Sequence, residues 1–472
     1  MKLSIIVSAA GLVGYASGMA CPYHLLKRAG LLGADVVEKF DQLKDNPELA
    51  ERFIQAQNHP GHQKRDTLIG PRDTSGNLDL PLGGGLLNGH LQPLTGLLSG
   101  FLLPTPQLPG LKEIPGDDPD HQFQPPGPHD VRGTCPASNA LANYGYLNRS
   151  GITTFAEVAD AFQTGFGFGF DLSVFLSGLA LLAGGDLLTG TYSIGGADAR
   201  VPNTLGPAPG MSSHGVFEID GSITREDTYF GNNANFILQR WDEYVEIANR
   251  NGGQFGWETN GEDNGYRYDL SRETNPEFYA GALWFAVSHA ERVFVWEGFA
   301  NGTDQNADWN NIAPFFLNET FPPNWYRRGT PFSIPQAFGE AGLLFLSNPR
   351  ILGGNEGSVD NFVPLPSAVN FTQLAGNPAE LGCWLVENIL DVAPGQVRGA
   401  IRENFDLYQG FLKGVILPFF TDDGFFNCNF TGFFEPGNSE GEEPALGLSS
   451  DGSPVNGAYP GIGVIKPHSE PS

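Results

Sequence analysis

Residues 130–147 read DVRGTCPASNALANYGYL, and the rest of the chain is interpreted from this stretch. Proline suits the first position of a helix, so the proline after Cys135 predicts a helix over Ala137–Leu147. The free amides and the dipole at a helix N-terminus favour a thiolate, which makes Cys135 a candidate metal ligand. The alternative is a buried structural cysteine. The pair Cys21-Pro22 has no such helix after it, so the Cys-Pro pair alone identifies nothing.

This stretch resembles the signature of the haem-thiolate peroxidases, the family of fungal chloroperoxidase and the unspecific peroxygenases. In that family a Pro-Cys-Pro precedes a helix that reads Asn-Ala-Leu-Ala-Asn-His-Gly-Tyr. Thr134 and Tyr144 depart from it, at positions that are usually proline and histidine. The resemblance implies a mainly α fold with long irregular loops, a single haem-binding helical domain of chloroperoxidase or peroxygenase type. It also implies haem b with iron bound by Cys135, whose thiolate would donate charge that promotes O–O cleavage.

Residues 213–225 read SHGVFEIDGSITR and are similar to the family's cation-binding segment. The resemblance implies that the Glu218 carboxylate, the Ile219 carbonyl and the Ser222 hydroxyl hold Mg²⁺ or Mn²⁺ beside a haem propionate. These are hard oxygen donors, as both ions prefer. The alternative is an acidic turn built by the Asp-Gly pair. Isoleucine at 219 cannot titrate, unlike the histidine found there in chloroperoxidase-like members.

Residues 284–294 read WFAVSHAERVF and resemble the helix that bears the family's acid-base glutamate. Glu291 matches that glutamate, and a carboxylate there can move the proton of a bound peroxide between its two oxygens. The alternative is a solvated surface glutamate. Trp284 takes the place of the arginine of long peroxygenases, and His289 is a possible substitute proton carrier, or else a core or surface histidine.

Two aromatic residues match side chains that line the substrate channel of long peroxygenases. They are Phe217, beside the predicted cation ligand, and Phe294, three residues after the predicted acid-base glutamate. Aromatic residues at these spacings also occur in ordinary cores. A third set, Phe166, Phe168 and Phe170, alternates with glycines and could form an aromatic lip.

The composition excludes some partners and indicates export. A formal net charge of −27 disfavours nucleic acid and anionic membranes, and no stretch after the N-terminus is long and apolar enough to span a bilayer. Residues 1–20 resemble a signal peptide. Sequons at Asn148, Asn301, Asn318, Asn370 and Asn429 agree with export, although Asn148 falls in a motif that we expect to pack closely.

Further segments are predicted around the catalytic domain. Residues 21–65 form a possible pro-segment, since Lys64-Arg65 resembles a dibasic processing site, although the pair could equally be solvated. Residues 66–124 form an irregular Gly/Leu/Pro-rich segment, 125–434 the haem-thiolate peroxidase domain, and 435–472 a disordered tail. Cys383 and Cys428 both lie in the C-terminal third, and we predict that they form a disulfide.

The sequence therefore predicts a secreted enzyme, monomeric or homodimeric, that uses hydrogen peroxide on small aromatic or other apolar organic substrates. Two alternatives remain open. One is a tailoring peroxidase dedicated to a single secondary-metabolite pathway. The other is a haem-binding family member with weak or no peroxide turnover, because Trp284 and Ile219 depart from the family pattern.

Overall fold

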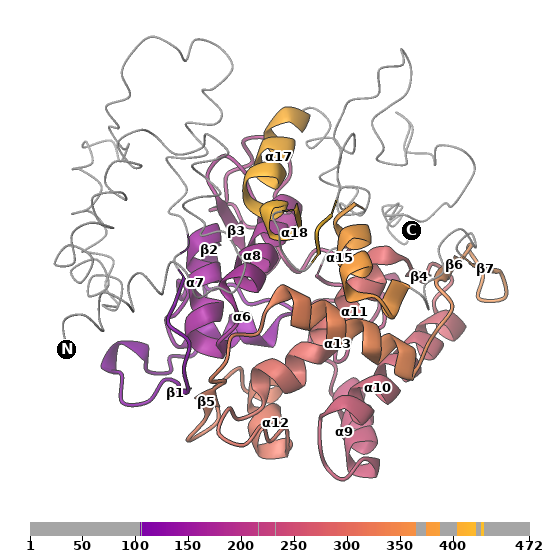
Figure 1. Ribbon diagram of the computed structural model, residues 1–472, viewed down its shortest axis with the longest axis horizontal. Coiled ribbons are helices and arrows are strands. Elements are labelled where there is room, and N and C mark those ends of the chain that lie inside the picture. The colour runs from indigo at the N-terminus through magenta and orange to yellow at the C-terminus, as the bar shows by residue number, and fades with distance from the viewer. Residues whose placement is uncertain are drawn as a thin grey trace.

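Helices form most of the regular structure in the described residues, which agrees with the predicted fold class (Figure 1). The computed structural model describes residues 104, 106–215, 217–231, 233–364, 374–387, 404–421 and 426–428. The signal peptide, the pro-segment and the C-terminal tail lie outside these residues. The described part of the predicted irregular segment, within 106–124, contains only a short strand and one 3₁₀ turn.

The elements follow one another along the chain with few strands between them. The helices are α6 (Pro136–Asn143), α7 (Phe155–Phe166), α8 (Phe170–Gly184), α9 (Leu238–Arg250), α10 (Trp257–Thr274), α11 (Ala282–Phe294), α12 (Trp309–Leu317), α13 (Ile334–Ser347), α15 (Pro378–Glu387), α17 (Phe405–Phe411) and α18 (Pro418–Thr421). The antiparallel strand pairs are β1 (Lys112–Glu113) with β5 (Tyr326–Arg327), and β2 (Ile152–Thr154) with β3 (Thr191–Ser193). A three-stranded sheet joins β4 (Tyr279–Ala280), β6 (Gly353–Asn355) and β7 (Phe362–Pro364).

Two groups of helices are distinguished in Figure 1. Helices α6, α7 and α8 lie together with β2 and β3, and α7 packs along α8. The other group contains α9, α10, α11 and α13, in which α11 packs on α10 and α13. The core between these elements is rich in phenylalanine and tryptophan. No helix among the described residues is long and apolar enough to cross a membrane.

The predicted helix boundaries are corrected in several places. The sequence pattern predicts a helix over Glu277–Val293, but α11 begins only at Ala282, because Tyr279–Ala280 pairs with the strand β6. The pattern also predicts a helix over Val397–Leu417; this region is described only from residue 404 and contains a π-helical turn over Leu412–Ile416. Helices α10, α12 and α13 were not predicted.

Candidate functional site

Cys135 is the N-cap residue of α6, as the sequence predicts, with Pro136 at the first helical position. The loop before it is locked by Asn139, which is fully buried. The Asn139 side chain accepts a hydrogen bond from the Gly133 amide at 2.9 Å and donates one to the Gly133 carbonyl at 2.8 Å. Only glycine fits at 133, because a Cβ there would lie 1.8 Å from the carbonyl oxygen of Ile194.

The second segment holds the cysteine loop from the other side. The Thr134 amide donates to the Ser212 hydroxyl at 3.2 Å. Arg225, at the end of the predicted cation-binding segment, donates from Nη2 to the Thr134 carbonyl at 3.1 Å. These two contacts place both ends of residues 212–225 directly against the residue before Cys135.

Cys135 is the free cysteine of the described residues, and the residue as a whole is half-buried. Burial raises the pKa of the Cys135 thiol, and this effect outweighs the hydrogen bonds from Ser138 and Ala137 that favour the thiolate. The negative charge of Glu291 raises the pKa further. A metal cation at the sulfur is the kind of ligand that reverses this balance and fixes the thiolate.

Glu218 is buried, and one of its oxygens is left for a further ligand. Its Oε2 accepts hydrogen bonds from the His214 ring at 2.7 Å and from the Asn233 amide at 2.5 Å. Within the part of the chain that the structure describes, its Oε1 has no hydrogen-bond partner, although the side chain is only 1% exposed. An unpartnered buried carboxylate oxygen is costly, and a divalent cation would satisfy it. Glu218 therefore fits the predicted cation.

The other two predicted cation ligands are less informative. Ile219 is buried with its side chain in the apolar core, and Ser222 is half-buried. The Ser222 carbonyl accepts a hydrogen bond from Arg267 at 2.8 Å. Among the residues that the structure describes, no group of three or more His, Cys, Asp and Glu side chains is arranged to hold a metal ion. The cation site remains a prediction.

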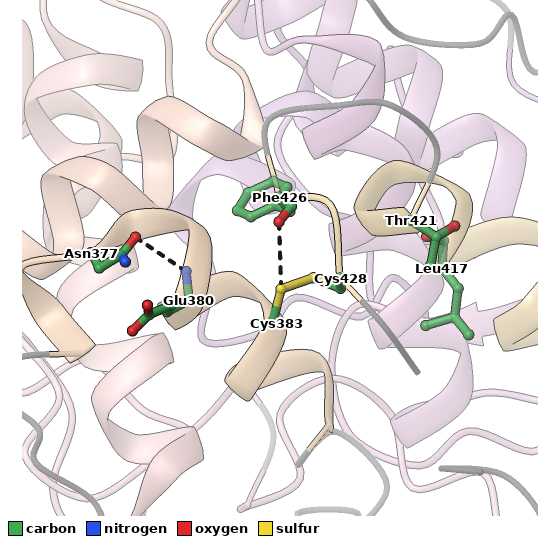
Figure 2. The surroundings of a disulfide bond; sticks show 7 residues. All are labelled: Asn377, Glu380, Cys383, Leu417, Thr421, Phe426 and Cys428. Atoms are coloured by element: carbon green, nitrogen blue, oxygen red, sulfur yellow. Dashed lines mark hydrogen bonds between the residues drawn. A yellow bond between two sulfur atoms is a disulfide. The ribbon is translucent and has the colours of Figure 1, made fainter. Parts of the chain in front are cut away.

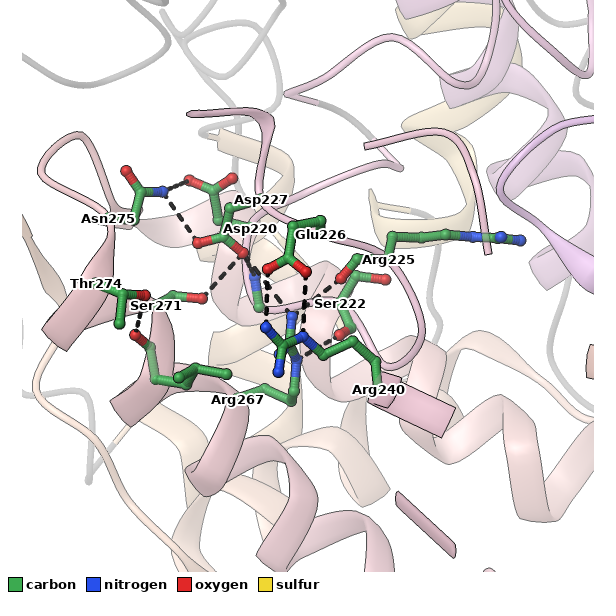
Figure 3. A network of polar contacts seen from close by, with 12 residues as sticks. Asp220, Ser222, Arg225, Glu226, Asp227, Arg240, Arg267, Ser271, Thr274 and Asn275 are labelled. Atoms are coloured by element: carbon green, nitrogen blue, oxygen red, sulfur yellow. Dashed lines mark hydrogen bonds and ion pairs between the residues drawn. The ribbon is translucent and has the colours of Figure 1, made fainter. Parts of the chain in front are cut away.

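The segment that contains Glu218 is held by a buried polar network, which includes Asp220, Asp227 and Asn275 (Figure 3). The Asn275 amide donates to both Asp220 and Asp227 at 3.0 Å, which holds the two carboxylates together. Burial, and then the neighbouring charge of Asp227, raise the pKa of Asp220 to about 8. The Asp-Gly pair thus does build an acidic turn, and Glu218 adds its unpartnered oxygen beside it.

Glu291 lies in the C-terminal half of α11 and is partly accessible. Burial raises the pKa of its carboxyl to about 8, Arg292 opposes this rise, and the negative charge of Glu218 adds to it. Electrostatic effects of this size act over short distances. Glu291 contributes to the raised pKa of Cys135, and Glu218 contributes to the raised pKa of Glu291, so residues from all three sequence segments lie near one another.

Trp284 and His289 belong to the core and not to this site. Trp284 is 3% exposed, and its indole N–H donates to the Asp220 carbonyl at 2.8 Å. His289 contacts the Asn264 amide at 2.8 Å and the Phe285 carbonyl at 2.8 Å, one through each ring nitrogen. Burial lowers the pKa of His289 to about 3, so its ring is neutral. The reading of His289 as a core histidine is supported over that of a proton carrier.

The predicted channel aromatics, Phe217 and Phe294, are both half-buried and pack on the core. Phe294 lies 5.3 Å from Phe168 and 6.0 Å from Phe332, measured between ring centroids. Phe168 is buried, so it does not form the aromatic lip that was considered for it and instead packs against Phe294. Phe166 is also fully buried.

The structure joins Cys383 of α15 to Cys428, which confirms the predicted disulfide (Figure 2).

Of the sequons, Asn148 and Asn318 are exposed. The expectation that Asn148 is covered is therefore wrong, because the residue lies in the turn after α6. Asn301 is half-buried and donates to the Asn324 carbonyl. Asn370 and Asn429 lie outside the described residues.

Sequence reasoning missed several residues that build the site. Arg225 was quoted as part of a segment but given no role, although it is buried and reaches the cysteine loop. Arg292 forms a buried ion pair with Asp263 of α10, at 2.8 Å. A signal was present in the sequence, since a charged residue such as Arg292 on an otherwise apolar helix needs a buried partner.

Comparison with known proteins identifies the family of this chain. The model of peroxidase family 2 matches residues 121–330, which contain all three segments. An aromatic peroxygenase of Coprinellus radians is 36% identical over 239 residues, which is 48% of this chain and 90% of the relative. An aromatic peroxygenase of Cyclocybe aegerita is 30% identical over 64% of this chain and 82% of its own length.

A third relative comes from a biosynthetic pathway. The dothistromin biosynthesis peroxidase dotB of Dothistroma septosporum is 29% identical over 339 residues, which is 64% of this chain and 80% of the relative. The cysteine loop, the helical fold and these relatives lead to one conclusion. The chain belongs to peroxidase family 2, the fungal haem-thiolate peroxidases and peroxygenases, and is an oxidoreductase that acts with peroxide.

Proposed function

We propose that this protein is a secreted peroxygenase or peroxidase that uses hydrogen peroxide to oxidise aromatic or other apolar organic molecules. The observation that carries the proposal is the convergence of a free, partly accessible Cys135 at a helix N-terminus with a partly accessible Glu291 whose pKa is raised to about 8. A thiolate ligand and an acid-base group are the two protein groups that peroxide chemistry at haem requires.

Cys135 would hold haem b, which supplies the oxidising chemistry once peroxide has bound. The loop before α6 would fix the direction of the sulfur, because Asn139 holds the backbone of Gly133 and Ser212 holds the amide of Thr134. A rigid loop orients the sulfur with little loss of entropy on binding. Glu218 Oε1 would bind a divalent cation, Mg²⁺ or Mn²⁺, whose charge would offset the carboxylates gathered in this region.

Glu291 would act on the peroxide itself. Its ionised carboxylate accepts the proton from one peroxide oxygen, and the protonated carboxyl then donates it to the other oxygen as the O–O bond breaks. A carboxyl with a pKa near the working pH is suited to both steps. The half-buried Phe217 and Phe294 would present an apolar surface to the substrate.

A second candidate is a peroxidase dedicated to one biosynthetic pathway, which the similarity to the dothistromin biosynthesis peroxidase favours. Both candidates share the haem and the acid-base group, and they differ in the range of substrates. Turnover of several unrelated aromatic compounds with peroxide favours the general enzyme, whereas turnover of none of them favours the dedicated one.

The ligand assignment is tested by the absorption spectrum of the reduced protein under carbon monoxide. A thiolate ligand should give a Soret band that is shifted to the red of that of histidine-ligated haem. Cys135→Ala should abolish this band, and Cys21→Ala, which changes the other Cys-Pro pair, should leave it unchanged. A histidine-type spectrum, or loss of the band only in the Cys21 variant, would refute the assignment. Export is tested by recovering the processed, glycosylated protein from the culture medium.

A further inference from the structure

Next to Glu291 in the chain is an arginine that does not reach solvent. Arg292 and its partner Asp263 on α10 are each 1% exposed. The Nε and Nη2 atoms of Arg292 both donate to Oδ2 of Asp263, at 3.1 Å and 2.8 Å. A buried ion pair is expensive to desolvate and is weak evidence of stabilisation, so its position is more informative than its presence.

The same guanidinium reaches the cation-binding segment. Nη2 of Arg292 donates to the Gly221 carbonyl at 3.1 Å, and Nη1 donates to the Ser288 carbonyl at 3.0 Å. From α10, Arg267 donates to the carbonyls of Ser222 and Arg225, at 2.8 Å and 3.0 Å (Figure 3). Two buried arginines therefore hold the turn after Glu218 in a fixed position relative to α11.

We propose that Arg292, held in place by Asp263, is a positioning residue for Glu291: the ion pair sets the electrostatic environment in which that carboxylate accepts and returns a proton. This inference rests on the proposed acid-base role of Glu291. Arg292 does not touch the peroxide, and it acts through its charge and through the backbone that it holds.

The charges around Glu291 support this assignment. The positive charge of Arg292 lowers the pKa of Glu291. The negative charge of Glu218, on the neighbouring segment, raises it. The Cys135 thiol interacts with Glu291 from the start of α6. Two further carboxylates on elements packed against α11, Glu297 and Glu340, interact instead with Arg328.

This arrangement predicts opposite effects from the two halves of one ion pair. Asp263→Asn leaves the charge of Arg292 uncompensated, so the pKa of Glu291 should fall. Arg292→Gln removes the cation and leaves Asp263, so the same pKa should rise, by about one pH unit. In the double variant, the pKa of Glu291 should lie close to the wild-type value. Arg292→Lys keeps the positive charge, so the pKa of Glu291 should stay near the wild-type value in this variant too. A pair that only stabilised the fold would give no such opposition.

The pKa is measured on the haem-containing protein by infrared titration of the protonated carboxyl band that is lost in Glu291→Gln. Opposite shifts in the two single variants support the inference, and shifts of the same sign, or none, overturn it. The rate of haem oxidation by peroxide is followed over the same pH range. If the carboxyl band shifts as expected while the pH dependence of haem oxidation does not change, the acid-base role of Glu291 fails and the electrostatic role of Arg292 stands. Thermal melting of each variant identifies any that do not fold, and the Lys and double variants then provide the test.

Discussion

The proposed acid-base role of Glu291, together with its raised pKa, predicts that the reaction with peroxide depends strongly on pH. The carboxyl must be ionised to accept the peroxide proton, and burial raises its pKa to about 8. At a pKa of about 8, roughly one carboxyl in ten is ionised at pH 7 and about one in a hundred at pH 6. The rate of haem oxidation should therefore fall about tenfold for each pH unit below the midpoint and become constant above it.

A cation bound at Glu218 would shift this midpoint in a direction that follows from the structure. The negative charge of Glu218 helps to raise the pKa of Glu291, so a divalent cation bound at Glu218 should lower it. Chelation of the cation should then move the midpoint to higher pH. Stopped-flow absorbance of the haem band after mixing with peroxide, repeated with and without a chelator, measures both effects.

Glu291→Gln removes the group that titrates. The variant should slow haem oxidation by about a hundredfold or more and make its rate nearly independent of pH, while the carbon monoxide spectrum is unchanged. The matched control is Glu273→Gln, which changes an exposed glutamate at the end of α10 and should alter neither property. If Glu291→Gln keeps both the rate and the pH profile of the wild type, the reasoning is wrong and another group moves the proton.

Three further outcomes follow from the same contacts. Glu218→Ala should lower the content of bound Mg²⁺ or Mn²⁺ measured by elemental analysis, and an unchanged content would contradict the cation assignment. Replacing Cys383 and Cys428 by serine opens a loop of sequence separation 45 and should lower the free energy of unfolding by about 4 kcal/mol, as measured by denaturant titration, whereas equal stability would contradict it. Trp284→Arg should destabilise the fold by roughly 3 kcal/mol or more, because the indole N–H bonds the Asp220 carbonyl in the core; a variant as stable as the wild type on thermal melting would show that this position tolerates charge.

The sequence predicts structure best where the interacting residues lie close together in the chain. A proline directly after Cys135 predicts that the cysteine caps a helix, and the asparagine at 139 closes the loop within six residues. The capping box of Thr154 and Glu157 begins α7 for the same reason, since both partners lie in one turn. Interactions of this kind need no knowledge of the rest of the fold.

Helix α10 shows where local reasoning fails. Its sequence is polar and contains glycines at 261 and 265, so no helix was predicted. The helix forms because its polar side chains find buried partners on other segments, as Asp263 does with Arg292 and Arg267 with the turn after Glu218. The glycine at 265 admits a neighbour, since a Cβ there would lie 2.3 Å from the Asn348 side chain after α13. Tertiary contacts therefore override the intrinsic helix propensity.

The sequence by itself determined the family and marked the candidate site residues, because each of the three segments has a distinctive local pattern around Cys135, Glu218 and Glu291. Only the tertiary structure decided which neighbouring side chains act on them. Trp284 turns into the core and bonds a carbonyl, while Arg292 is the buried cation that acts on the glutamate. Both lie on one helix, and their partners come from segments about 30 and 70 residues away. Spacing along a helix fixes the direction of a side chain, but the charge that it meets there depends on how distant segments pack.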